Sequence, residues 1–258
     1  MSDFSIEILV ADGVGILSWG PTASLDALSE AVGLTSAELL ARPELRRVEV
    51  VIDTDDRVGR RALHRAGFRL EGIRRAALVA DDGYADAAVY ARLADDSVGG
   101  PHGFSGVMNS VLPRKRCIAH ALVRDVAGRV CVLETTFKSD WELPGGIVET
   151  NESPRQGCER EITEELGLEL SVGRLLVVDW LGPYLGWEDA LELIFDAGVL
   201  SREQVAAVVP DAFEVRGVHW LDLAEALLYL APFARGRLGA AVAALSGETV
   251  YLERGRPV

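Results

Sequence analysis

The sequence predicts an α+β protein of two domains, and three observations lead to this expectation. Residues 95–113 combine glycines, small polar residues and two prolines without a sustained helical or strand period, which is typical of a linker. Strand-length apolar runs and helix-length patterns occur on both sides of this segment. The length of 258 residues allows two domains of ordinary size. We therefore expect an N-terminal domain at residues 1–95, a linker at 96–113 and a C-terminal domain at 114–258.

The composition indicates a globular, cytoplasmic protein, with 49% hydrophobic and 26% charged residues. No apolar run approaches the ~20 residues of a membrane span, and Met1 to Phe4 lack the basic stretch that begins a secretion signal. The three cysteines have no Cys-x-x-Cys spacing, so we expect neither a disulfide framework nor a zinc site. The net charge of −14 argues against a nucleic-acid partner, which would require a basic surface. We expect neither nucleic acid nor membrane as a partner.

Local patterns place strands and helices in the C-terminal domain. Strands are expected at 117–124, 129–134, 174–180, 191–195 and 218–221, and a helical stretch at 223–230. The best-defined helix is expected at 153–166. Ser153 is a good N-cap, Pro154 suits the first turn, Gln156 completes a capping box and Gly167 suits the C-terminal end.

This helix carries an unusual concentration of negative charge. Glu161, Glu164 and Glu165 stand at i, i+3 and i+4 and project from one side, where like charges repel. A hard divalent cation such as Mg²⁺ or Mn²⁺ would relieve that repulsion, because it requires several oxygen ligands. Gly145 and Gly146 precede the helix and are expected to let a ligand approach the backbone.

Such a site suits hydrolysis of a pyrophosphate bond. A bound Mg²⁺ neutralises charge on a diphosphate, orients it and lowers the pKa of a water molecule, and a neighbouring glutamate can serve as general base. We therefore expect an activity that is lost on chelation.

The same stretch resembles the motif of the Nudix (MutT-like) hydrolases. That motif runs Gly, five residues, Glu, seven residues, Arg-Glu, an aliphatic residue, any residue, Glu-Glu, any residue, Gly and an aliphatic residue. The fixed positions are filled by Gly146, Glu152, Arg160, Glu161, Ile162, Glu164, Glu165, Gly167 and Leu168. Asn151 stands where many members have glycine, at a position that is not fixed. The resemblance implies a mixed β-sheet between helices, with the motif forming loop–helix–loop.

The resemblance also implies roles for these residues. The main metal ligands would be Glu161, Glu164 and Glu165, assisted by the carbonyl oxygen of Gly145. Glu152 would bind a further metal ion or steady the loop. Arg160 would orient the glutamates, and Glu161 is the candidate general base. Glu214, in a later loop, is a second candidate base or ligand and equally an ordinary exposed carboxylate. Gly145, Gly146, Glu214 and Trp187 are the candidate substrate-binding residues.

The implied substrate is a nucleoside diphosphate linked to another group. Nucleoside triphosphates or oxidised nucleotides rank ahead of ADP-ribose and nucleotide sugars, although Pro183 resembles a proline of the ADP-ribose hydrolases. Trp141, Tyr184 or Trp187 would stack on a base or belong to the core. A nucleotide-binding sensor built on the same fold ranks second, because such proteins commonly lose motif glutamates and this sequence has lost none.

The N-terminal domain resembles the C-terminal half of GNAT acetyltransferases, which implies a smaller α/β domain. The matching residues are Val48-Glu49-Val50, Arg60-Arg61-Ala62-Leu63, Ala66-Gly67-Phe68, Glu71-Gly72, Asp86 and Tyr90-Ala91-Arg92-Leu93. A strand at 45–53, a helix at 57–66 and helical patterns at 24–32 and 36–40 fit this reading.

The departure from that family concerns acetyl-CoA. Members of that family bind the pyrophosphate of acetyl-CoA with a glycine-rich loop at the start of a helix. In this sequence Gly13-Val14-Gly15 lacks the leading Arg or Gln and is not followed by the start of a helix. We expect a degenerate acetyltransferase-like domain that serves for protein interaction or for formation of a homodimer. Four arginines form either a basic face for an acidic partner or an ordinary solvated face: Arg57, Arg60, Arg61 and Arg65.

Overall fold

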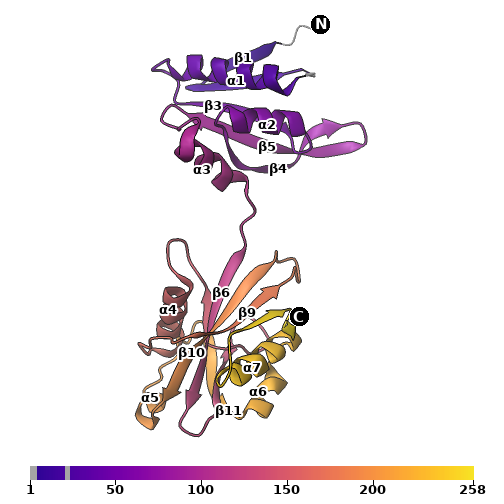
Figure 1. Cartoon of the computed structure of the whole chain (residues 1–258). Coiled ribbons are helices and arrows are strands. Elements are labelled where there is room, and N and C mark those ends of the chain that lie inside the picture. Colours follow the sequence, from indigo (N-terminus) through magenta and orange to yellow (C-terminus); the bar gives the residue numbers. More distant parts are fainter. Residues whose placement is uncertain (1–4, 21–23) are drawn as a thin grey trace. The chain divides into compact units, whose positions relative to one another are not determined.

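The computed structural model describes residues 5–20 and 24–258. The chain divides into two compact units, Met1–Pro113 and Arg114–Val258 (Figure 1). Met1 to Phe4, which entered the expectation of a cytoplasmic location, lie outside the described residues. Within the described part of the chain, no helix has the length and apolar character needed to cross a bilayer.

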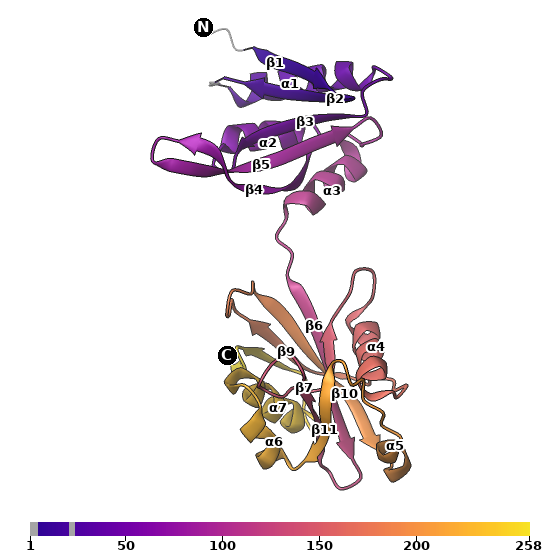
Figure 2. The same cartoon turned by 180° about the vertical axis from the view of Figure 1, so that it is seen from behind.

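The N-terminal unit is built on a five-stranded sheet. In spatial order its strands are β1 (Ile6–Ala11), β2 (Val14–Trp19), β3 (Arg47–Asp53), β5 (Gly83–Leu93) and β4 (Arg69–Ala80). β2 and β3 run parallel, and the other neighbours run antiparallel. Helices α1 (Leu25–Leu40) and α2 (Arg57–Arg65) cover one face of the sheet and bury its core (Figures 1 and 2).

Helix α1 is continuous where the sequence pattern suggested two shorter helices. Gly33 and Thr35 interrupt the apolar pattern between them. The helix continues because Val32, Ser36 and Leu39 all turn buried side chains inward, so packing on the sheet outweighs the weak local propensity.

The expectation of a linker at residues 96–113 is wrong. Most of this segment forms helix α3 (Gly100–Val111), which packs against β4 and belongs to the N-terminal unit. Pro101 lies in its first turn, Val107 is buried, and the Ser110 hydroxyl accepts a hydrogen bond from the Leu70 N–H at 3.0 Å. Glycines disfavour an isolated helix by about 1 kcal/mol each, and tertiary packing supplies what local propensity lacks.

The C-terminal unit contains an eight-stranded mixed sheet with helices on both sides (Figure 2). Its main path, in spatial order, is β11 (Val215–Leu221), β7 (Val130–Thr135), β6 (Arg116–Asp125), β10 (Ala190–Leu200), β9 (Leu175–Leu181), β12 (Val250–Glu253) and β13 (Arg256–Pro257), with β8 (Gly145–Ile147) paired to β6. The parallel pairs are β6–β10 and β9–β12. The helices are α4 (Pro154–Leu166), α5 (Arg202–Ala206), α6 (Leu223–Tyr229) and α7 (Pro232–Ala244). The expected mixed sheet between helices is confirmed.

Two hydrophobic cores lie on the two faces of this sheet. Alternate residues of a strand point to opposite faces, so Ala121 of β6 packs with Ile162 and Leu166 of α4. The next residue, Leu122, packs on the other face with Leu238 of α7. The strand β6 is therefore apolar on both sides, and it fixes the position of the loop and helix that follow β8.

Candidate active site

Strand β8, which leads into the loop before α4, makes two close contacts that require glycine. Gly145 pairs with His120 of β6 and has φ +130°, and a side chain there would meet the Ala119 carbonyl oxygen at 2.2 Å. A Cβ on Gly146 would lie 2.7 Å from the Glu161 carboxylate. The expected reason for these glycines, room for a ligand, is therefore incomplete, because the protein itself fills the space beside them.

Helix α4 begins and ends as its sequence predicts. The Ser153 hydroxyl accepts from the Gln156 N–H, the Gln156 side chain accepts from the Ser153 N–H, and Pro154 lies in the first turn. Gly167 ends the helix in the left-handed conformation, with φ 66°. These local signals set where the helix begins and ends.

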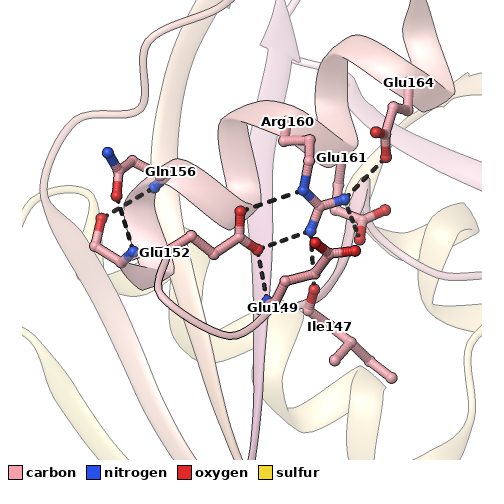
Figure 3. A network of polar contacts seen from close by, with 8 residues as sticks. Ile147, Glu149, Glu152, Gln156, Arg160, Glu161 and Glu164 are labelled. Carbon is pink, nitrogen blue, oxygen red and sulfur yellow. Dashed lines mark hydrogen bonds and ion pairs between the residues drawn. The ribbon is translucent and has the colours of Figure 1, made fainter.

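Arg160 binds three of the motif glutamates at once (Figure 3). Its guanidinium donates to Glu152 at 2.8 and 3.2 Å, to Glu161 at 3.0 Å and to Glu164 at 2.9 Å. A further donor reaches the Ile147 carbonyl oxygen at 3.1 Å. All five guanidinium donors are thereby engaged, and the three carboxylates are drawn to one side of α4.

Glu165 points into the protein rather than toward Arg160. Its carboxylate is buried and accepts a hydrogen bond from the Gly145 N–H at 2.7 Å. Burial raises its pKa to about 8, opposed by that hydrogen bond and increased further by the negative charges of Glu142, Glu161 and Glu214. The pKa of Glu161 is also raised, first by burial, and Arg160 opposes that shift. The raised pKa values of Glu165 and Glu161 mean that the protein by itself does not stabilise the charged forms of these two inner carboxylates.

This arrangement fits a divalent cation in its donor chemistry. Hard cations bind carboxylate and carbonyl oxygens, and positive charge between the inner carboxylates would relieve the repulsion that adds to the effect of burial on their pKa values. Over residues 5–20 and 24–258, no three acidic, imidazole or thiol groups already stand in the arrangement that holds a metal ion. Arg160 accounts for part of this, because it takes oxygens of Glu161 and Glu164 that a cation would need.

Glu214 is brought into the electrostatic neighbourhood of the site. It lies in the exposed loop before β11, its backbone carbonyl accepts from the Thr136 N–H at 2.9 Å, and its charge raises the pKa of Glu161 and Glu165. Trp187 is not brought to the glutamates by any of its described contacts. Its ring is exposed and lies 4.6 Å from the Arg116 guanidinium carbon.

The aromatic residues separate into different roles. Trp141 is stacked between His219 and Tyr229, with both ring centroids 4.0 Å away, so neither of its faces is open to a base. Tyr184 meets Phe233 edge-on at 5.6 Å and remains half exposed. Of the three candidates for base stacking, Trp141 is therefore core.

Sequence reasoning missed four polar residues beside the motif, which are Lys138, Glu142, His120 and Glu192. Glu142 follows Trp141, forms an ion pair with Lys138, and lies 3.9 Å from His120 Nε2. His120 Nδ1 is hydrogen-bonded to the Glu192 carboxylate at 3.0 Å, and burial lowers the pKa of His120 to about 4. No spacing rule connects these residues, because β6, β10 and the β7–β8 segment bring them together only in the folded sheet.

Comparison with known proteins bears on the C-terminal unit. Residues 114–241 match the family model described as the NUDIX domain. The chain is 38% identical over 58 residues to a "MutT-like protein" of Streptomyces ambofaciens, covering 22% of this chain and 37% of that protein. It is 36% identical over 67 residues to an 8-oxo-dGTP diphosphatase of Proteus vulgaris, covering 24% and 60%. It is 42% identical over 60 residues to a CTP pyrophosphohydrolase of Escherichia coli strain K12, covering 22% and 43%. The chain thus spans less than two thirds of the length of each relative.

Proposed function

We propose, from the premise that residues 114–241 form a Nudix domain, that this chain is a metal-dependent hydrolase of pyrophosphate bonds. The substrate would be a nucleoside diphosphate linked to another group. The observation that carries the proposal is the placement of Glu161 and Glu165 against Gly146 and Gly145 in a loop–helix that retains every fixed position of the motif.

Each motif residue has a role in this proposal. Glu161, Glu164, Glu165 and the Gly145 carbonyl oxygen would hold Mg²⁺ or Mn²⁺, and Glu152 would hold a further ion or steady the loop. The bound metal would supply charge neutralisation and a water molecule of lowered pKa. Arg160 would keep the glutamates in position, which its contacts support. Glu161 is the candidate general base, with Glu214 as the alternative.

Within this class, nucleoside triphosphates or oxidised nucleotides are the favoured substrates, ahead of ADP-ribose and nucleotide sugars. The names of two relatives, an 8-oxo-dGTP diphosphatase and a CTP pyrophosphohydrolase, support that ranking. A nucleotide-binding sensor is the second candidate function. The exposed Trp187, together with Arg116, suits contact with a base in either case.

The proposal is tested by turnover on a panel of nucleotides. The panel comprises nucleoside triphosphates, 8-oxo-dGTP, ADP-ribose, diadenosine polyphosphates and sugar nucleotides, each with Mg²⁺ and with Mn²⁺. We expect turnover of one class and its loss in EDTA, because the acidic site repels an anion when no cation is bound. Binding of a nucleotide without turnover of any member of the panel would contradict the hydrolase function and favour the nucleotide-binding sensor.

We also propose that the N-terminal unit is a degenerate acetyltransferase-like domain through which two copies associate. Gly13 lies in the turn between β1 and β2, and α1 begins only after its N-cap Ser24, so these glycines do not open a helix. Strand β1 is a sheet edge that exposes Ile8, Leu9 and Val10, and such edges invite pairing.

Two measurements on the full chain test this role. Calorimetric titration with acetyl-CoA is expected to give no heat of binding. Light scattering is expected to give the mass of a dimer for the wild type and of a monomer for Ile8→Lys, because a charge on the edge blocks strand pairing. Specific binding of acetyl-CoA would contradict a degenerate acetyltransferase-like domain. A monomeric wild type would contradict its role in dimerisation.

The cytoplasmic location remains part of the proposal. The three free cysteines, two of them buried, suit a reducing compartment. Cell fractionation followed by immunodetection would test it.

A further inference from the structure

Lys138 stands at the edge of the acidic site. It lies on the exposed segment between β7 and β8, and its ammonium pairs with the Glu142 carboxylate. Glu142 is one of the charges that raise the pKa of Glu165, and Lys138, Glu142 and Glu161 all act on the pKa of buried His120. Contacts connect Lys138 to Glu165: Glu142 lies 3.9 Å from His120 Nε2, His120 pairs with Gly145 across β6 and β8, and the Gly145 N–H donates to Glu165 at 2.7 Å.

An anionic substrate at this site needs positive charge that the motif itself does not offer. Arg160 has all five donors engaged by Glu152, Glu161, Glu164 and the Ile147 carbonyl oxygen. Any cation bound by the inner glutamates is first balanced by their own charge. Lys138 differs from Arg160: among the described residues its ammonium pairs with one carboxylate and lies 5.6 Å from the centroid of the Phe137 ring, and its side chain is 39% exposed.

We propose that Lys138 binds the phosphate chain of the nucleotide, exchanging Glu142 for a phosphate oxygen when substrate enters. This inference rests on the proposed function, since it assigns a substrate-binding residue to that site. An ammonium on a flexible stem can make this exchange, and a hydrogen bond between charged groups is stronger than a neutral one. Glu142 then acts as the resting partner that positions Lys138 in the absence of substrate.

A purely structural role for the Lys138–Glu142 pair makes a different prediction, and paired variants separate the two. If Lys138 binds phosphate, Lys138→Gln raises KM about tenfold with kcat nearly unchanged, whereas Glu142→Gln leaves KM unchanged or lowers it. Lys138→Arg should recover part of the loss. If the pair were only structural, the two glutamine variants would have the same effect.

The chain provides a matched control for this experiment. The sequence has two lysines, and the other one, Lys115, also forms an ion pair with a carboxylate, that of Asp189. Lys115→Gln therefore removes the same charge and the same kind of pair at another place. It should leave KM within twofold of the wild-type value.

The chemical reactivity of the same two lysines gives a second test, which does not depend on turnover. Acylation with an N-hydroxysuccinimide ester, followed by peptide mass spectrometry, gives the modification rate of each. A non-hydrolysable α,β-imido nucleoside triphosphate with Mg²⁺ should slow acylation of Lys138 severalfold and leave that of Lys115 unchanged.

The outcomes separate this inference from the proposed function. Equal protection of both lysines, or a Lys138→Gln KM within twofold of wild type, overturns the role of Lys138 and leaves the hydrolase standing. Absence of turnover in the wild type would overturn the proposed hydrolase function. The protection experiment would still decide whether Lys138 contacts the phosphate chain of a bound nucleotide.

Discussion

Replacing Glu165 with glutamine is expected to lower kcat about 10³-fold, the upper end of the loss seen when one group is removed from a preorganised electrostatic site. Glutamine keeps an oxygen that can accept from the Gly145 N–H, so the loop retains its 2.7 Å contact. What is removed is a buried negative charge that a divalent cation requires. The measurement is steady-state turnover on the best nucleotide of the panel.

The same variant should be more stable than the wild type. Burial raises the pKa of Glu165 to about 8, and repulsion from the negative charges of Glu142, Glu161 and Glu214 adds to this shift. A neutral amide removes that repulsion, so the thermal unfolding midpoint without added metal should rise.

A control outside the site completes this test. Glu169→Gln makes the same charge change at an exposed position just beyond α4 and should alter neither kcat nor stability. Loss of stability together with activity in Glu165→Gln would mean that this carboxylate supports the fold, and the metal role would be wrong.

Short-range signals made the helix of the site predictable from the sequence. Ser153, Pro154, Gln156 and Gly167 each act on the backbone within a few residues, and all four behave in the structure as expected. The strands β6, β7, β9 and β11 were likewise marked by runs of apolar residues, and the expected ends lie within a few residues of those observed.

The division of the glutamates was not predictable in this way. The i, i+3, i+4 spacing puts Glu161, Glu164 and Glu165 on one side of the helix, but Glu165 is buried and Glu164 is exposed. The contact that decides this is with the Gly145 N–H, twenty residues earlier. Helix periodicity alone contains no information about which part of the loop lies opposite each position.

Elements stabilised mainly by distant contacts escaped the sequence analysis. The strands β12 and β13 are short, and β12 exists because it pairs with β9. The sequence analysis assigned helix α3 to a linker because glycines have a low helix propensity. Packing against β4 stabilises the helix despite that low propensity. In both cases the missing information is the neighbour in space.

Arg237 is the clearest case of an interaction that only the fold creates, and replacing it with methionine should destabilise the C-terminal unit by about 3–5 kcal/mol. Arg237 is buried in α7, beside Asp179 of β9 and Glu192 of β10. Its Nε lies 3.1 Å from Asp179 Oδ2, as an ion pair without the alignment of a hydrogen bond, and its Nη1 contacts the Glu192 carboxylate. Methionine fills similar space but leaves two buried carboxylates without a cation. Urea unfolding followed by tryptophan fluorescence measures the loss.

The physical cause can be separated from lost packing by charge and by pH. Arg235→Met changes an exposed arginine of the same helix and should cost no more than about 1 kcal/mol. Adding Asp179→Asn and Glu192→Gln to Arg237→Met should restore most of the stability, because no unpaired charge then remains. Burial already raises the pKa of Asp179, so in Arg237→Met the folded state takes up protons before the unfolded state. The penalty should therefore shrink as the pH falls through that raised pKa. A penalty that stays constant with pH and persists in the triple variant would mean that the shape of Arg237, and not its charge, holds α7 to the sheet.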